Sequence, residues 1–195
     1  MRPEALDQDV ADARRTGVEA GQRGPSTRVS RSFAFIDLCG FTDFADLHGD
    51  DAAVAELRIL RANVREAAGA AGVRVDKWLG DGVMLVGVEP QPLVTAVIAL
   101  RRHHEERGCL PVRGGLATGA VILLDGDDYV GRAVNLAARL CERAEPGQIL
   151  AATDDGLTLP DGTHATSARS FHIKGFVSPV VVVALVPITS APLAG

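Results

Sequence analysis

The sequence contains few aromatic residues and few cysteines, and each shortage limits what the protein can be. Aromatic residues make up 4% of the 195 residues, so the core must depend on Val, Leu, Ile and Ala. The three cysteines, Cys39, Cys109 and Cys141, are far apart, odd in number and outside any CxxC pair. This pattern argues against structural zinc and favours a reducing cytoplasm.

Long apolar runs are also missing. No stretch reaches the roughly 18 apolar residues that a membrane-spanning helix needs, and the longest candidate runs only from Val180 to Leu185. The N-terminus is rich in acidic residues and lacks the apolar segment of a secretory signal. We therefore expect a cytoplasmic protein without a membrane span.

An excess of positive charge is absent as well. Lys and Arg total 20 against 25 Asp and Glu, which gives a net charge of −5. This balance argues against a protein that coats nucleic acid, so we expect no nucleic-acid partner. The GxxxxGK[ST] segment of a P-loop hydrolase is also absent.

The length fits one domain with additional sequence at its ends. Residues 1–28 are polar and are predicted to form a mobile arm. Residues 29–188 are predicted to form a single folded domain, and residues 189–195 a short tail.

Apolar periodicity predicts alternating strands and helices. Asp50 is the expected N-cap of the first long helix, and Pro92 is expected to begin the second. The adjacent His103 and His104 near the end of that second helix predict a solvated helix terminus rather than a metal site. Strands are predicted at 33–38, 73–79, 83–88, 111–118, 120–124, 149–151, 171–173 and 180–185, helices at 50–69, 92–104 and 131–143, and a loop at 157–166.

The order of these elements indicates the fold class. Strand, helices, hairpin, helix and strand suit an α+β fold with a ferredoxin-like βααββαβ core sheet. Its helices are expected to pack on one face, and the last strands are expected to extend the sheet.

Two isolated carboxylates lie at predicted strand ends. Asp37 ends the apolar run that begins at Phe33, and Asp81 lies between Gly80 and Gly82 in a predicted hairpin turn. Each alone is also typical of a capping or turn residue. If the two strands are neighbours, however, the carboxylates converge at one edge of the sheet, where they suit Mg²⁺.

Donor side chains form a second candidate group. Asn135 and Arg139 are four residues apart and therefore share a helix face, where they could stabilise charge on a phosphoryl group. Arg113 and Lys174 are further candidate phosphate cations. Each alone is more typical of a solvated surface charge.

Lys77 and Asp128 form a third group. A lysine donor and an aspartate acceptor together can read the edge of adenine, whereas guanine presents the opposite pattern. The alternative is a simple surface ion pair.

Four segments in this order resemble the catalytic domain of class III nucleotidyl cyclases. Residues 35–42 (FIDLCGFT) and 77–82 (KWLGDG) are similar to the family's two metal motifs. Residues 112–119 (VRGGLATG) resemble its central strand, and residues 128–140 (DYVGRAVNLAARL) its transition-state helix. The match spans about residues 33–185, and it implies the class III fold and an adenylate cyclase of bacterial, actinobacterial type.

The resemblance implies a role for each candidate. Asp37 and Asp81 would hold two Mg²⁺ ions per site, with Mn²⁺ as a substitute. The remaining implied roles are adenine selection by Lys77 and Asp128, polyphosphate binding by Arg113 and Lys174, ribose orientation by Asn135, and stabilisation of the charged α-phosphate by Arg139. The implied reaction converts ATP to 3′,5′-cyclic AMP and pyrophosphate.

The resemblance also implies a head-to-tail homodimer with shared sites. One subunit would supply Asp37, Asp81 and Arg113, and the other Lys77, Asp128, Asn135, Arg139 and Lys174. Two departures from the family stand out. The segment from Thr118 to Asp128 is short, which weakens the expected dimer clasp, and Gly114-Gly115 is expected to loosen its strand.

Other functions remain to be weighed. A catalytically weak nucleotide-binding regulatory module would have the same fold, but loss of a metal aspartate would favour it and none is lost. A guanylate cyclase is disfavoured by Lys77 and Asp128. A diguanylate cyclase would need the GG[DE]EF segment, which is absent.

Overall fold

A computed structural model describes residues 28–125, 128–154 and 156–188. The predicted arm, except Arg28, and the predicted tail lie outside the described residues. The elements are β1 (Arg28–Leu38), α1 (Phe41–His48), α2 (Asp50–Ala71), β2 (Arg74–Leu79), β3 (Gly82–Gly87), α3 (Pro90–Arg107), β4 (Val112–Leu124), β5 (Asp128–Val130), α4 (Arg132–Arg143), β6 (Ile149–Ala152), β7 (Thr163–Ala165), β8 (Arg169–Phe171) and β9 (Val180–Pro187).

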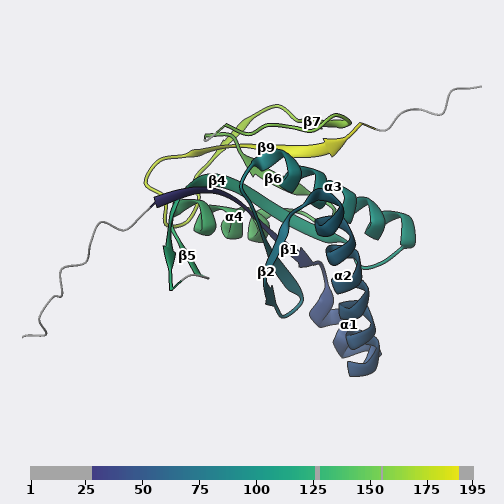
Figure 1. Cartoon of the computed structure of the whole chain (residues 1–195). Coiled ribbons are helices and arrows are strands. Elements are labelled where there is room, and N and C mark those ends of the chain that lie inside the picture. The colour runs from purple at the N-terminus through teal and green to yellow at the C-terminus, as the bar shows by residue number, and fades with distance from the viewer. Residues whose placement is uncertain (1–27, 126–127, 155, 189–195) are drawn as a thin grey trace, which may run out of the picture.

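One mixed sheet organises the molecule (Figure 1). Its strand order is β2-β3-β1-β4-β6-β9-β7, with β5 paired to β4 and β8 paired to β9. The chain order from β1 to β4 is βααββαβ, which confirms the predicted α+β core. The later strands extend this sheet beyond β4, as expected.

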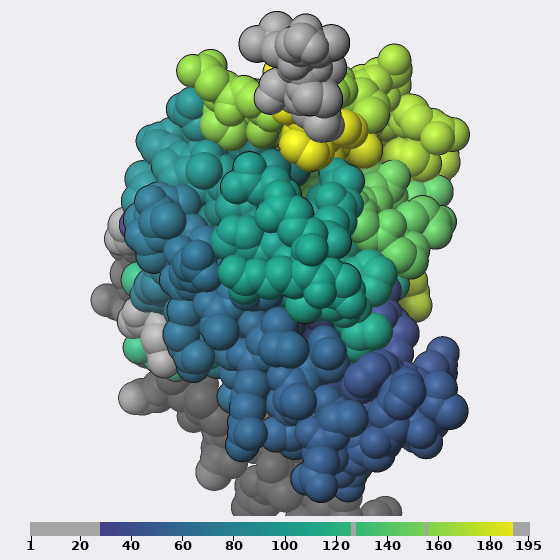
Figure 2. Space-filling model, turned by 90° about the vertical axis from the view of Figure 1, so that its right-hand side faces the viewer, coloured from purple at the N-terminus to yellow at the C-terminus, as the bar shows by residue number. Residues whose placement is uncertain are grey.

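Helices cover both faces of the sheet, because the side chains of β1 alternate between two apolar clusters. Ala34 and Ile36 pack with residues of α2 and α3, whereas Phe33 packs with residues of α4. Figure 2 shows α1, α2 and α3, blue to teal, at the surface of the first face. The prediction that the helices of the βααββαβ core pack on one face therefore holds for α2 and α3, and α4, which follows that core, covers the other face.

Several element boundaries differ from the prediction. The second long helix, α3, begins at Pro90 rather than Pro92, and the strand predicted at 171–173 is β8 at Arg169–Phe171. The first predicted long helix is α2, which is preceded by a separate helix, α1. The N-cap of α2 is Gly49 rather than Asp50.

Residues 112–124 form one continuous strand instead of two, since β4 pairs with β1 from Leu38↔Val112 to Arg28↔Ile122. An unbroken partner strand keeps Gly119 in the ladder.

The predicted loop at 157–166 contains the short strand β7. This strand pairs with β9 from Thr163↔Pro187 to Ala165↔Leu185. Three residues are too few for a clear alternation of apolar and polar side chains, so the pattern gave no signal.

Gly115 allows α4 to approach the sheet closely. A Cβ atom at this position would lie 2.2 Å from the carbonyl oxygen of Ala137 and 2.3 Å from the backbone nitrogen of Cys141. At Gly114 it would meet Ile36 and Ile149 side chains on the opposite face. The prediction that this pair loosens the strand is therefore wrong, because both glycines make room for close packing in a regular strand.

His104 is buried, with 1% of its surface exposed, so the predicted solvated terminus is wrong for this residue. Its Nδ1 lies 2.9 Å from the carbonyl oxygen of Leu110. Since a carbonyl only accepts, the ring donates Nδ1–H. Burial lowers the pKa of His104, opposed by this hydrogen bond, and favours the neutral ring.

In the described residues, no helix is both long and apolar enough to cross a membrane.

Candidate active site

Asp37 and Arg113 face each other at one end of the sheet. They are register partners on β1 and β4. Arg113 donates from Nε and Nη2 to one carboxylate oxygen of Asp37, over 3.0 and 2.6 Å. The hydrogen bond to Asp37 raises the pKa of Arg113. The side chains of Asp37 and Arg113 are 26% and 33% exposed, respectively, so solvent and ligands can reach the pair.

Asp81 lies beside this pair, in the turn between β2 and β3. The backbone nitrogen of Leu38 donates to the carbonyl oxygen of Asp81 over 3.3 Å, which ties the turn to the end of β1. Burial raises the pKa of the Asp81 carboxyl, and the negative charge of Asp37 raises it further, against a local backbone hydrogen bond. The turn therefore brings two carboxylates close enough to repel each other.

Gly82 allows the turn that carries Asp81 to lie close to Asp37. It pairs with Asp37 across β1 and β3. A Cβ atom at Gly82 would lie 2.9 Å from the carbonyl oxygen of Ile36 and 3.3 Å from Oδ1 of Asp37. A glycine is thus required for the close approach of the turn to β1.

The chemistry of this corner fits a hard divalent cation. No group of three or more His, Cys, Asp and Glu side chains in the described residues is arranged to hold a metal, so Asp37 and Asp81 would share the cation with substrate and water oxygens. Mg²⁺ usually binds in this way. Two thiols lie nearby, but burial raises the pKa of Cys141 to about 12 and also raises that of Cys39. Protonated thiols are poor ligands for a soft metal.

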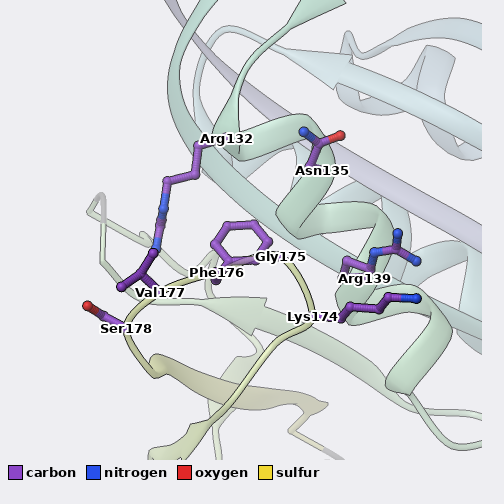
Figure 3. A pocket seen from close by; sticks show the side chains of 8 residues that line it. All are labelled: Arg132, Asn135, Arg139, Lys174, Gly175, Phe176, Val177 and Ser178. Carbon is purple, nitrogen blue, oxygen red and sulfur yellow. The ribbon is translucent and has the colours of Figure 1, made fainter.

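A second group lines a hollow of about 600 Å³ on the outer side of α4 (Figure 3). Asn135 and Arg139 reach it from α4, and Lys174 reaches it from the segment between β8 and β9. Figure 3 shows the ends of Arg139 and Lys174 pointing in the same direction. Arg139 also donates to both carboxylate oxygens of Glu142, over 2.9 and 2.7 Å.

Arg132 and Phe176 also line this hollow, and the sequence reasoning missed both. The guanidinium carbon of Arg132 lies 4.9 Å from the centre of the Phe176 ring. A terminal nitrogen of Arg132 lies 3.8 Å from a carboxylate oxygen of Asp154. Arg132 precedes Asn135 by three residues, so helical periodicity could have identified it. No comparable signal marks Phe176.

Lys77 and Asp128 form the third group. They are joined by an ion pair of 2.6 Å between Nζ and Oδ1. The hydrogen bond from Lys77 lowers the pKa of Asp128. Tyr129 fixes the position of β5, because its ring packs edge-to-face on Phe33, with 5.2 Å between ring centres. Both charged side chains remain partly exposed, so the pair can exchange its internal bond for a ligand.

The described residues of a single chain do not join all three groups. No hydrogen bond or ion pair within this part of the chain links Asp37 or Asp81 with Asn135 or Lys174. Glu142, another residue that sequence reasoning missed, comes closest to a link. Its carbonyl oxygen accepts from Arg113 over 3.4 Å, and its carboxylate holds Arg139.

The chain has relatives among known proteins. No family model matches the chain. An uncharacterized protein of Mycobacterium tuberculosis is 40% identical over 157 residues, which cover 80% of this chain and 41% of that protein. A pH-sensitive adenylate cyclase of the same species is 33% identical over 154 residues, or 76% of this chain and 38% of its own length. The chain thus spans about two fifths of the length of the curated relatives it matches.

Solved structures of cyclases share the fold of this chain. The crystal structure of the adenylyl cyclase CyaB from P. aeruginosa is similar at a TM-score of 0.69 and 28% identity, over 82% of this chain and 95% of that chain. The guanylyl cyclase Cya2 matches at a TM-score of 0.68 and 22% identity, over 87% of this chain and 98% of that chain. The fold is therefore shared by cyclases that are named for different bases.

Proposed function

Because the chain has the catalytic-domain fold of the class III nucleotidyl cyclases and sequence relatives among adenylate cyclases, we propose that it converts ATP to 3′,5′-cyclic AMP and pyrophosphate. The observation that carries the choice of ATP is the pair formed by Lys77 and Asp128, with Nζ and Oδ1 2.6 Å apart. A donor and an acceptor held side by side match the acceptor nitrogen and donor amine of adenine. Guanine would present a carbonyl oxygen and an N–H donor to them in the wrong order.

The reaction needs no protein nucleophile, because the attacking group belongs to the substrate. The 3′-hydroxyl oxygen forms a bond to the α-phosphorus, the bond from that phosphorus to the bridging oxygen breaks, and pyrophosphate leaves with the bond electrons. The hydroxyl proton passes to solvent. The protein therefore acts mainly by positioning and by stabilising charge.

Asp37 and Asp81 are the residues that would hold the divalent cations. When bound, Mg²⁺ or Mn²⁺ lowers the pKa of the attacking hydroxyl and neutralises phosphate charge. Arg113 neutralises Asp37 in the free protein. With a divalent cation bound at Asp37, the Arg113 guanidinium would be available to bind the polyphosphate.

Donors on α4 and the following segment act on the reacting phosphate. Asn135 would orient the ribose, and Arg139 would stabilise the negative charge that develops on the α-phosphate. Arg139 must exchange Glu142 for the substrate, which an exposed ion pair allows at small cost. Lys174, on the opposite wall of the same hollow, would bind the departing phosphates.

A homodimer would complete the site. Within the described part of one chain, the carboxylate corner and the α4 hollow are not joined by hydrogen bonds or ion pairs. A head-to-tail arrangement would place Asp37, Asp81 and Arg113 of one subunit opposite the other five residues of its partner. Because one chain contains both sets, a two-fold dimer would form two equivalent sites.

A catalytically weak nucleotide-binding module is the second candidate. It is favoured by the internal pairing of Arg113 with Asp37 and of Arg139 with Glu142, since a protein that rarely turns over can leave its charges paired.

The test is a turnover assay with ATP and GTP, each with Mg²⁺ or Mn²⁺, at several protein concentrations. Cyclic AMP from ATP alone, with specific activity that rises with concentration, supports the cyclase and the dimer. Nucleotide binding without product at any concentration supports the regulatory module.

A further inference from the structure

A second hollow of about 720 Å³ lies beside the C-terminal end of α4, and the proposed reaction does not use it. Its floor contains the half-buried Ala184 on β9, above the buried side chains of Leu150 on β6 and Val182 on β9. Phe171 on β8 adds an aromatic ring to the same face of the sheet. The partly accessible Phe171 and Ala184 favour a ligand with a flat apolar body.

Two arginines border this floor. The guanidinium carbons of Arg143 and Arg169 lie 4.2 and 5.6 Å from the centre of the same Phe171 ring. An arginine stacked on a ring keeps its N–H groups in the plane of the guanidinium, where they remain available to an anion. The ring therefore holds two cationic donors at one site.

Neither arginine is neutralised within the described part of the chain. The ion pairs found there include Arg132 and Arg139 of the same helix but not Arg143 or Arg169. Glu145 lines the hollow as well, so two positive charges face one negative charge. A single negative charge on a ligand balances this set, whereas a polyphosphate would exceed it.

We propose that this hollow, bordered by Arg143, Arg169 and Phe171, binds an organic monoanion that carries a carboxylate or sulfonate group on a flat apolar body. The charged group binds the two guanidinium groups, and the apolar body lies against the half-buried Phe171 and Ala184. Gln148 and Ser167, which also line the hollow, supply further polar partners. The proposal concerns binding alone and does not depend on the proposed cyclase activity.

A pair of fluorescent dyes tests this proposal on the full chain. The monoanion 1-anilinonaphthalene-8-sulfonate is titrated in parallel with its uncharged relative N-phenyl-1-naphthylamine. Arg143→Gln with Arg169→Gln is expected to raise the Kd of the sulfonate at least tenfold, or about 1.4 kcal/mol, and to leave that of the neutral dye unchanged. The double Lys variant is expected to recover part of the affinity, because it retains the charge but not the planar stacking.

The controls locate the dye. Arg102→Gln changes an exposed arginine on α3 and is expected to leave both titrations unchanged. Circular dichroism confirms that each variant is folded. The proposal is overturned if the native protein does not bind the sulfonate, or if the double Gln variant binds it equally well. It is also overturned if Arg139→Gln, in the first hollow, abolishes binding while the double Gln variant does not.

Discussion

Arg113 and Asp37 form a bidentate contact in which two guanidinium nitrogens donate to one carboxylate oxygen over 3.0 and 2.6 Å. The contact joins Arg113, which is proposed to bind polyphosphate, to Asp37, which is proposed to bind the metal. In the free protein, Arg113 therefore occupies the position at Asp37 where a divalent cation would supply positive charge.

This contact predicts that Arg113 competes with the metal. Arg113→Gln is expected to strengthen Mn²⁺ binding in the absence of nucleotide, because it removes a cation from Asp37, and to lower turnover of ATP. Electron paramagnetic resonance of free Mn²⁺ measures the first effect, and cyclic AMP formation measures the second. Arg102→Gln serves as the control for general loss of positive charge. Unchanged or weaker Mn²⁺ binding would contradict the competition.

Shared sites predict complementation between two inactive variants. Asp37→Ala removes a metal ligand, and Asn135→Ala removes a donor that the partner subunit would contribute to the same site. Each is expected to lose turnover alone while remaining folded. A co-expressed mixture is expected to recover about a quarter of native activity, since half of randomly formed dimers are hybrids and each hybrid has one intact site. An inactive mixture with proven hybrid dimers would exclude shared sites.

The ion pair between Lys77 and Asp128 predicts base selection. Lys77→Ala is expected to lower kcat/KM for ATP about 10- to 100-fold, because a hydrogen bond to a charged group contributes roughly 1.5–3 kcal/mol. It should affect GTP turnover much less, which reduces the discrimination between the bases. Steady-state assays with both nucleotides measure this ratio. An equal loss with ATP and GTP would show that the pair is structural.

The raised pKa of Asp81 predicts a pH-dependent cost in the metal-free protein. Burial, and secondly the charge of Asp37, disfavour the ionised carboxylate in the folded state, so the folded pKa exceeds the unfolded one. Ionisation of Asp81 therefore destabilises the folded protein. This part of the stability of the fold is fully present below the unfolded pKa and is lost as pH rises through the folded pKa. With EDTA at pH 7, Asp81→Asn is therefore expected to have a higher Tm than the native protein.

Metal should reverse that order. Mn²⁺ is expected to raise the Tm of the native protein, because binding to the folded state adds stability, and to leave Asp81→Asn nearly unchanged. Thermal unfolding with and without Mn²⁺, at several pH values, provides the measurement. If Asp81→Asn is less stable than the native protein in EDTA, the ionised Asp81 carboxylate does not destabilise the fold.

The close approach of α4 to Gly115 predicts a strong effect of a single methyl group. Gly115→Ala is expected to cost about 3 kcal/mol of unfolding free energy, the upper end for overpacking, because the methyl group meets backbone atoms that cannot rotate away. Gly69→Ala on α2 is the matched control. A methyl group added there would have no atom within 4 Å, so this substitution is expected to stabilise the helix by about 0.5–1 kcal/mol. Urea unfolding compares the two, and equal stabilities would refute the packing argument.

Local patterns were sufficient for much of the fold. The run from Phe33 to Leu38 and the periodic apolar residues from Val54 to Val64 identified a core strand and a core helix. They did not reveal the continuity of β4, since Gly119 is held in the strand by its pairing with Arg31. Nor did they reveal the burial of His104, whose partner is a backbone carbonyl at Leu110.

The sequence by itself determined the types of chemical group and their order along the chain. It carried two acids at strand ends, a donor pair at helical spacing, and a Lys and an Asp suited to adenine. Only the tertiary structure decided which side chains meet. The contact of Lys77 with Asp128 spans 51 residues, that of Arg113 with Asp37 spans 76, and the stacking of Arg143 on Phe171 joins a helix to a distant strand. Such contacts depend on strand order and on packing against the whole sheet, and neither is encoded in the spacing of neighbouring residues.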